Sequence, residues 1–244
     1  MRLLLLAGTG EARTLAEALS SERRLSVIAS LAGATRTPVS LGVPTRIGGF
    51  GGREGFESFL DHEGIGAVLD ATHPFATRIS HRTAEVCADR HIPYMQFLRR
   101  AWLPVEGDAW VFLNEECEAA RHIPSGARVF VATGRRTLER LTCLEGRFLY
   151  VRQIDPPEAP FPLDNGEYVV GRPPFSVEDE ETLFHRLGID WLVVKNAGGA
   201  ASRSKLDAAR NLGIPVAMIR RPLQPEAPKV ETVSEALAWV RRRL

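Results

Sequence analysis

The sequence predicts two tandem Rossmann-like domains, each a doubly wound α/β domain with a parallel sheet, that face a central cleft. Short and almost continuously apolar runs alternate with segments of helical period, which is typical of parallel strands covered by helices on both faces. This alternation occurs twice along the 244 residues. In each half the first apolar run ends in a glycine turn, at Gly8-Thr9-Gly10 and at Thr133-Gly134.

The elements of the first half follow from its apolar periodicity. Short apolar runs predict the strands Leu3–Ala7, Leu25–Leu31, Val43–Ile47, Ala67–Ala71 and Pro93–Leu98. Intervening segments of helical period predict helices at about 11–20, at Gly52–Glu63 and at Ala76–Arg90. In the second of these helices Phe56, Phe59 and Leu60 share one face, and Pro74 suits the first turn of the third.

The second half repeats this order. Its expected strands are Arg128–Ala132, Phe148–Val151, Trp191–Val194 and Pro215–Ile219. Its expected helices are Arg136–Leu144, Val177–Leu187, Ala200–Leu212 and Val233–Arg243. The proline-rich stretches Asp155–Pro162 and Arg172–Phe175 are either rigid connecting loops or a wall of the cleft, because long loops in compact domains are often functional.

The two halves match closely enough to indicate a tandem duplication. A strand ending in Arg99-Arg100 corresponds to one ending in Arg220-Arg221, and a loop that contains proline follows each pair. We expect domains at residues 1–113 and 114–244. The short extended pieces Trp110–Leu113 and Lys229–Glu231 occupy the same place in each half, so they could be exchanged between the two sheets.

Composition excludes several classes of protein. Hydrophobic residues make up 44% and charged residues 25% of the chain, as in globular proteins. The formal net charge of +1 argues against bulk binding of nucleic acid or of an acidic membrane surface. Leu3–Ala7 is too short for a signal-peptide core or a membrane span, so we expect a cytoplasmic protein.

The three cysteines, Cys87, Cys117 and Cys143, are widely scattered and form no CxxC pair. We therefore expect reduced thiols and no metal site.

The turn Gly8-Thr9-Gly10-Glu11 lies where α/β proteins receive a phosphate at the N-terminus of a helix. The match to GxGxxG is incomplete because Arg13 occupies the third glycine position, and Glu11 is an awkward neighbour for a pyrophosphate. A plain tight turn is the alternative.

The second strand favours NADPH over NADH as the cofactor. Domains that bind NAD place an acidic residue about 20 residues after the glycines, but none occurs between Glu22 and Glu54. Thr35, Arg36 and Arg46 follow instead, and hydroxyls and guanidinium groups suit a 2′-phosphate. The glycine-rich loop with Gly48, Gly49 and Phe50 either lies against the cofactor or is a flexible connector.

The segment Asp70-Ala71-Thr72-His73-Pro74-Phe75 ends the fourth strand, and carboxyl ends of parallel strands face the ligand. His73 could donate a proton to a substrate, with Asp70 as its orienting partner. A purely structural histidine is the alternative. We expect Thr72, Pro74 and Phe75 to contact the cofactor.

Cations and helix openings gather at the corresponding strand ends of the second half. This combination suits a ligand with several carboxylates, although solvated surface charges are the alternative. The candidate substrate-binding residues are Thr133, Gly134, Arg135, Arg152, Lys195, Asn196, Gly198, Gly199, Ser202 and Lys205.

Taken together, these segments resemble the precorrin-6A reductase family over essentially the whole chain. Asp-Ala-Thr-His-Pro-Phe-Ala at 70–76 and Lys-Asn-Ala-Gly-Gly at 195–199 are the most specific matches, and Ala197 replaces the family's usual serine. The resemblance implies NADPH-dependent reduction of a double bond of precorrin-6A, or of its cobalt form, to precorrin-6B in cobalamin biosynthesis. It implies a tetrapyrrole substrate with many carboxylate arms and no flavin or catalytic metal.

Two other functions remain open at this point. One is an NADPH-dependent reductase of another small polyanionic substrate. The other is a two-lobed ligand-binding protein, for which the sequence shows no export signal.

Overall fold

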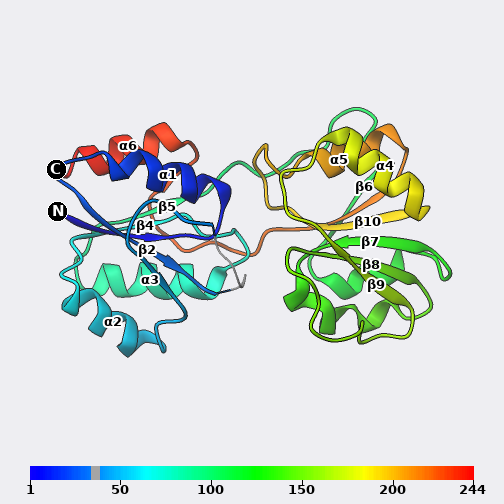
Figure 1. The fold of residues 1–244 in the computed structure, drawn as a ribbon, viewed down its shortest axis with the longest axis horizontal. Coiled ribbons are helices and arrows are strands. Elements are labelled where there is room, and N and C mark those ends of the chain that lie inside the picture. The colour runs from blue at the N-terminus through cyan, green and yellow to red at the C-terminus, as the bar shows by residue number, and fades with distance from the viewer. Residues whose placement is uncertain (34–38) are drawn as a thin grey trace. The chain divides into compact units, whose positions relative to one another are not determined.

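The computed structural model describes residues 1–33 and 39–244, and for residues 135 and 136 it describes only the backbone. This part of the chain divides into two compact units (Figure 1). One comprises Met1–Arg100 together with Pro222–Leu244, and the other comprises Ala101–Arg221. Within the described residues each unit holds a 6-stranded sheet, and the paired strands run parallel. The two Rossmann-like domains that the sequence predicts are therefore confirmed, and a central cleft stays a prediction.

The first sheet is built around the leucine run at the N-terminus. Leu3–Leu6 are almost completely buried, as expected for a strand that helices cover on both faces. The strand order is β12-β5-β4-β1-β2-β3. The strands are β1 (Arg2–Leu6), β2 (Ser26–Leu31), β3 (Thr45–Ile47), β4 (Ala67–Asp70), β5 (Tyr94–Phe97) and β12 (Lys229–Val230).

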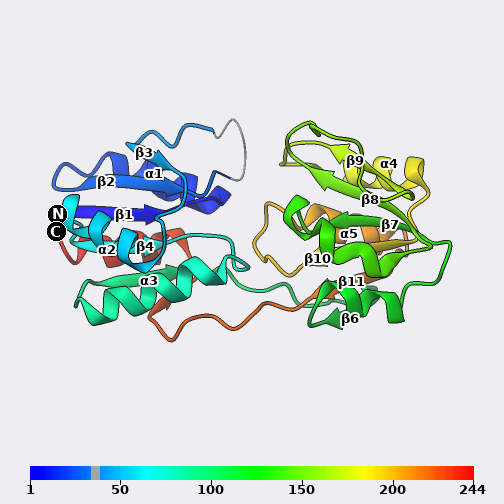
Figure 2. The same ribbon diagram turned by 90° about the horizontal axis from the view of Figure 1, so that it is seen from below.

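Helices cover both faces of this sheet (Figure 1 and Figure 2). On one face α1 (Gly10–Ser20) and α6 (Val233–Arg241) share a core in which Leu15 packs with Trp239. On the other face α2 (Arg53–His62) and α3 (Thr77–Asp89) share a core that includes Phe56 and Val86.

The second sheet has the order β6-β11-β10-β7-β8-β9. Its strands are β6 (Trp110–Leu113), β7 (Arg128–Ala132), β8 (Phe148–Gln153), β9 (Gly166–Val170), β10 (Trp191–Lys195) and β11 (Val216–Ile219). The α-helices α4 (Val177–Leu187) and α5 (Ser204–Asn211) lie on one face, and the 3₁₀ segments η1 (Glu116–Arg121) and η2 (Arg135–Leu144) lie on the other. Sequence patterns missed β9, an edge strand between the two proline-rich stretches, and predicted η2 as an ordinary helix.

The two sheets exchange their sixth strands, as the sequence suggested. β6 follows β5 along the chain but pairs with β11 of the second sheet. β12 follows β11 but pairs with β5 of the first sheet. Because of these crossings the units divide at 100/101 and again at 221/222, which differs from the expected single boundary after Leu113.

One expectation about the cysteines is wrong. Cys117 on η1 and Cys143 on η2 form a disulfide, with their Cα atoms 5.5 Å apart. Their wide spacing in sequence concealed this pairing, because only the fold places η1 and η2 on the same face of the sheet. Cys87 is a free and buried cysteine. Among the described residues, no helix is long and apolar enough to cross a membrane.

Candidate functional site

Both sheets have a topological switch point, where the strand order reverses and α/β proteins bind their ligands. In the first sheet it lies between β1 and β4, and in the second between β7 and β10. The candidate residues predicted from the sequence lie mainly beyond the carboxyl ends of these strands and of β2 and β8 beside them. Thr35 and Arg36 lie outside the described residues, and so does the side chain of Arg135.

Thr9 lies at the first switch point and links the two chain segments that meet there. It is the N-cap of α1, where its Oγ1 accepts the backbone N–H of Ala12 at 3.1 Å. The same hydroxyl donates to the carbonyl oxygen of Ala71 at 2.9 Å, so one side chain joins the start of α1 to the loop after β4.

The glycines on either side of Thr9 leave open space beside the helix N-terminus. Gly8 has a φ of +131°, which favours glycine, whereas Gly10 does not lie in the left-handed region. A Cβ added at either position would meet nothing within 4 Å. The backbone there can approach a ligand closely, and the positive end of the helix dipole favours an anion. The residues present therefore fit a dinucleotide pyrophosphate.

An ion pair resolves the difficulty that Glu11 posed for phosphate binding. Arg99, just beyond β5, donates from Nη1 to Oε2 of Glu11 at 2.6 Å. Both side chains are largely buried, at 13% and 22% exposure. The cation thus offsets the carboxylate charge in the first turn of α1. Sequence reasoning missed this role of Arg99, because β5 and α1 are far apart in the chain.

Arg46 on β3 joins the end of β2 to the glycine-rich loop. Its Nη1 donates to Oγ of Ser30 at 2.8 Å and to the carbonyl oxygen of Gly48 at 2.9 Å, and its Nη2 donates to that of Gly49 at 2.9 Å. Partial burial lowers the pKa of Arg46 from its ordinary value. The guanidinium therefore places positive charge beside the end of β2, where such folds hold the ribose of a dinucleotide.

Phe50 has a packing role in the structure. Its ring lies 4.8 Å from that of Phe56 and 5.1 Å from that of Phe59, measured between centroids, and the guanidinium of Arg46 lies 4.0 Å above it. A Cβ at Gly55 would lie 1.9 Å from the carbonyl oxygen of Phe50. The absence of a side chain at Gly55 therefore lets the loop that carries Phe50 pack closely on α2.

Asp70, at the end of β4, fixes the loop that follows it. Its side chain is fully buried. One carboxylate oxygen accepts the hydroxyl and the backbone N–H of Thr72, at 2.7 and 3.0 Å, and the other accepts the hydroxyl of Tyr94 at 2.8 Å. Burial raises the pKa of Tyr94, so this phenol stays a donor. These bonds join Asp70 to Thr72 and Tyr94, and its role as the orienting partner of His73 stays a prediction.

His73 lies on this loop and is partly exposed. Its Nδ1 accepts the backbone N–H of Phe75 at 3.3 Å. A neutral imidazole that accepts at Nδ1 carries its proton on Nε2. We assign this tautomer from the hydrogen bond. We name residues 71–76 the His73 loop.

At the second switch point Lys195 is held by groups on both sides of it. Its Nζ donates to the carbonyl oxygen of Thr133 at 3.2 Å and lies 3.7 Å from Oε1 of Glu116. Burial lowers the pKa of Lys195, and Glu116 acts in the opposite direction. Glu116, itself 4% exposed, also lies 3.6 Å from Arg140. Sequence reasoning missed Glu116, which reaches Lys195 because β6 joins the second sheet.

Asn196 uses both ends of its side chain to hold Trp102. Its Oδ1 accepts the backbone N–H of Trp102 at 2.8 Å, and its Nδ2 donates to the carbonyl oxygen at 2.9 Å. The indole of Trp102 donates to the carbonyl oxygen of Gly199 at 2.7 Å. Gly198 and Gly199 have φ of +69° and +79°, which favour glycine. The structure therefore gives Asn196 a role in shaping the loop after β10.

Arg152 and Lys205 lie in a buried cluster around Glu180. Arg152 donates to Glu180 at 2.6 Å and lies between the rings of Phe130 and Phe175. Lys205 donates from Nζ to the carbonyl oxygen of Ser202 at 2.6 Å, and burial lowers its pKa to about 8. The charge of Arg152 is thus already paired within the protein.

Comparisons with known proteins identify the family of this chain. Residues 2–241 match the family model Precorrin-6x reductase CbiJ/CobK. The chain belongs to this family. A Precorrin-6A reductase from Rhodococcus erythropolis is 41% identical, over 98% of this chain and 97% of that protein. A solved structure, CobK precorrin-6A reductase, is 38% identical with a TM-score of 0.95 and covers 99% of this chain and 96% of that one.

Two further relatives differ in the substrate that their names give. A Precorrin-6A reductase from Rhodobacter capsulatus is 39% identical over 98% of this chain and 95% of that protein. A Cobalt-precorrin-6A reductase from Priestia megaterium is 28% identical over 90% of each chain.

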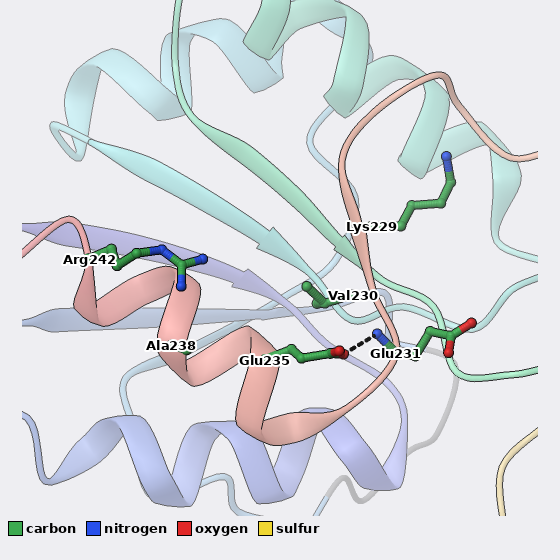
Figure 3. A pocket seen from close by; sticks show the side chains of 6 residues that line it. All are labelled: Lys229, Val230, Glu231, Glu235, Ala238 and Arg242. Atoms are coloured by element: carbon green, nitrogen blue, oxygen red, sulfur yellow. Dashed lines mark hydrogen bonds between the residues drawn. The ribbon is translucent and has the colours of Figure 1, made fainter.

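A hollow in the first unit is lined by residues other than the candidate site residues. Its lining residues are Lys229 and Val230 on β12, Glu231 just after that strand, Glu235 and Ala238 on α6, and Arg242 at the C-cap of α6 (Figure 3). Glu235 accepts the backbone N–H of Glu231 and caps α6 together with Thr232. Its carboxylate thus serves the helix start. Among the described residues, no group of three or more His, Cys, Asp or Glu side chains could hold a metal ion.

Proposed function

We propose that this chain reduces a ring double bond of precorrin-6A, with NADPH as the hydride donor, and so forms precorrin-6B in cobalamin biosynthesis. Membership of the precorrin-6x reductase family supports the reaction. The observation that carries the choice of cofactor is the first switch point: an open glycine turn at the start of α1, with Arg46 beside the end of β2.

The first unit binds NADPH in this proposal. Gly8, Thr9 and Gly10 hold the pyrophosphate at the N-terminus of α1, with Arg99 offsetting the charge of Glu11. Arg46, next to Ser30, favours the 2′-phosphate that distinguishes NADPH from NADH. Thr72, Pro74 and Phe75 on the His73 loop line the nicotinamide end.

The second unit binds the carboxylate arms of the tetrapyrrole. Lys195 is the leading candidate, because it lies at the end of β10 and shares the single carboxylate of Glu116 with Arg140, which leaves positive charge for a ligand. Gly134, Gly198 and Gly199 allow close approach of the backbone at the same sheet edge. The pairing of Arg152 with Glu180 makes it a weaker candidate, since its charge is already compensated.

The chain's own residues supply orientation and a proton. NADPH, when bound, supplies a hydride to one carbon of the double bond. The neighbouring carbon then takes a proton, which His73 would deliver from Nε2 while Nδ1 takes up a proton from solvent, so that the ring stays neutral. Asp70 keeps Thr72 in place through two hydrogen bonds, so the loop that carries His73 is anchored to the end of β4. Such positioning lowers the barrier by reducing the freedom lost on reaction.

The metal-free substrate is favoured over its cobalt form. The relatives named Precorrin-6A reductase are 41% and 39% identical, whereas the Cobalt-precorrin-6A reductase from Priestia megaterium is 28% identical.

Single-turnover oxidation of NADPH with purified precorrin-6A, with and without cobalt, tests the proposal. We expect NADPH absorbance to fall only when substrate is present, with a product heavier by two hydrogen atoms and with precorrin-6A faster than its cobalt form. Binding of NADPH without oxidation would overturn the reaction. Equal or tighter binding of NADH in a direct titration would overturn the choice of cofactor.

A further inference from the structure

The chain segment that enters the first unit after β11 is held against the His73 loop. In this segment, residues 222–225, the Nε2 of Gln224 donates to the carbonyl oxygen of Pro74 at 2.9 Å and to that of Pro222 at 2.8 Å. Its Oε1 accepts from Nε2 of Gln96 at 2.9 Å. Gln96 lies on β5 and is 3% exposed, so the Gln224 amide is oriented by a rigid part of the sheet.

The His73 loop is therefore held on both sides of its histidine. Before His73, Thr72 is bound by the Asp70 carboxylate. After it, the carbonyl of Pro74 is bound by Gln224. Phe75, whose N–H donates to His73 Nδ1, follows directly. A shift of the Pro74 peptide would move that donor, and with it the imidazole.

A comparable arrangement, with other contacts, occurs in the second unit. There the entering segment begins at Ala101, and Trp102 binds both Asn196 and Gly199 in the loop after β10. β10 occupies the place in its sheet that β4 occupies in the first. In each unit, the chain segment that arrives from the other unit thus binds the loop that follows β4 or its counterpart β10. The occurrence of such a contact in both units supports a role for the entering segment in positioning these loops.

We propose that Gln224 is a positioning residue for the reduction: by binding the Pro74 carbonyl it sets the direction of the His73 imidazole. This inference rests on the proposed function, in which His73 supplies the proton. Gln224 acts through the loop and touches neither substrate nor cofactor in this proposal.

The test is Gln224→Met, which keeps the size of the side chain and removes its donor and acceptor. Leu223→Ala is the matched control, because that side chain is 88% exposed in the same segment. Because the substitution removes neutral hydrogen bonds, each of modest net strength, we expect kcat to fall about three- to tenfold. The Kd of NADPH and the kcat of Leu223→Ala should be unchanged. Kinetics of Gln224→Met that equal those of the control would overturn the proposal.

A second readout does not require turnover. The imidazole resonances of His73, assigned by their loss in His73→Asn, should shift in Gln224→Met and stay in place in Leu223→Ala. Unshifted His73 resonances would also overturn the positioning role. If the wild-type chain did not reduce precorrin-6A, the proposed function itself would fail. An active wild type with an unaltered Gln224→Met variant would reject only the role of Gln224.

A double-mutant cycle with Gln96→Met separates positioning from general loss of structure. Because Gln96 acts by orienting the Gln224 amide, we expect its effect on kcat to be largely absent once Gln224 is Met. Effects of the two substitutions that multiply independently would show that Gln96 acts elsewhere and would contradict the proposed chain of contacts.

Discussion

Replacing Gly10 by alanine tests whether this glycine is required by the fold or by the cofactor. Gly10 is the first residue of α1, does not have the left-handed φ that favours glycine, and has nothing within 4 Å of an added Cβ. The fold itself thus has room for a methyl group. Since alanine reduces the freedom of the unfolded chain, we expect Gly10→Ala to raise the free energy of unfolding by about 0.4–1 kcal/mol.

That gain corresponds to a rise in Tm of about 1–4 °C for a chain of this size. The affinity for NADPH should fall, because the methyl group would occupy space that the pyrophosphate needs. Overpacking of this kind costs about 1–3 kcal/mol, so we expect Kd to rise by about five- to 150-fold.

Calorimetry on the cofactor-free protein and a fluorescence titration with NADPH measure the two effects. Thr14→Ala is the matched control, since Thr14 lies one turn later on the exposed side of α1. It should raise Tm slightly and leave NADPH affinity unchanged. A Gly10→Ala variant that is more stable and binds NADPH as the wild type does would refute the placement of the pyrophosphate at this helix.

Three further predictions concern the remaining candidate residues. Lys195→Ala should raise the KM for precorrin-6A about tenfold to a hundredfold, from the loss of a charged hydrogen bond, while the Kd of NADPH stays constant; a weakened NADPH affinity would instead place the cofactor in the second unit. His73→Asn should slow single-turnover NADPH oxidation by about 10²-fold or more, and a slowing below about tenfold would remove His73 as the acid. Burial lowers the pKa of Lys205 to about 8 from 10.5, so the folded protein binds fewer protons than the unfolded chain between these values, and stability should rise with pH across that window. Lys205→Met should flatten this rise in denaturation experiments at pH 8 and pH 10, and an unchanged slope would contradict the assignment.

Local patterns in the sequence determined most of the elements of this protein. Apolar runs such as Leu3–Leu6 predict buried parallel strands, because the information lies in the run itself. The repeat of the pattern predicted two domains and suggested the exchange of β6 and β12 that the structure shows. The sequence also placed most candidate residues at the carboxyl ends of strands, where the structure has them. That these sheet edges bind the ligands stays a prediction.

Only the tertiary structure decided the partners of the charged and polar side chains. The sequence places Glu180 28 positions from Arg152 and Glu116 far from Lys195, yet both carboxylates lie against those cations in the fold. The disulfide between Cys117 and Cys143 likewise forms between residues that only the fold brings together. Residue spacing carries no signal for such contacts, because they depend on which elements share one face of a sheet.

The roles of Asp70 and Phe50 show the same limit within the first unit. A sequence can place Asp70 at a strand end, but its bond to Tyr94 exists because β5 lies beside β4. The sequence places Phe50 in a loop that could lie against the cofactor, but only the structure shows that its ring packs on α2. Strand and helix periods are short-range properties of the chain, whereas the direction and the partner of a side chain are set by neighbours that folding brings together.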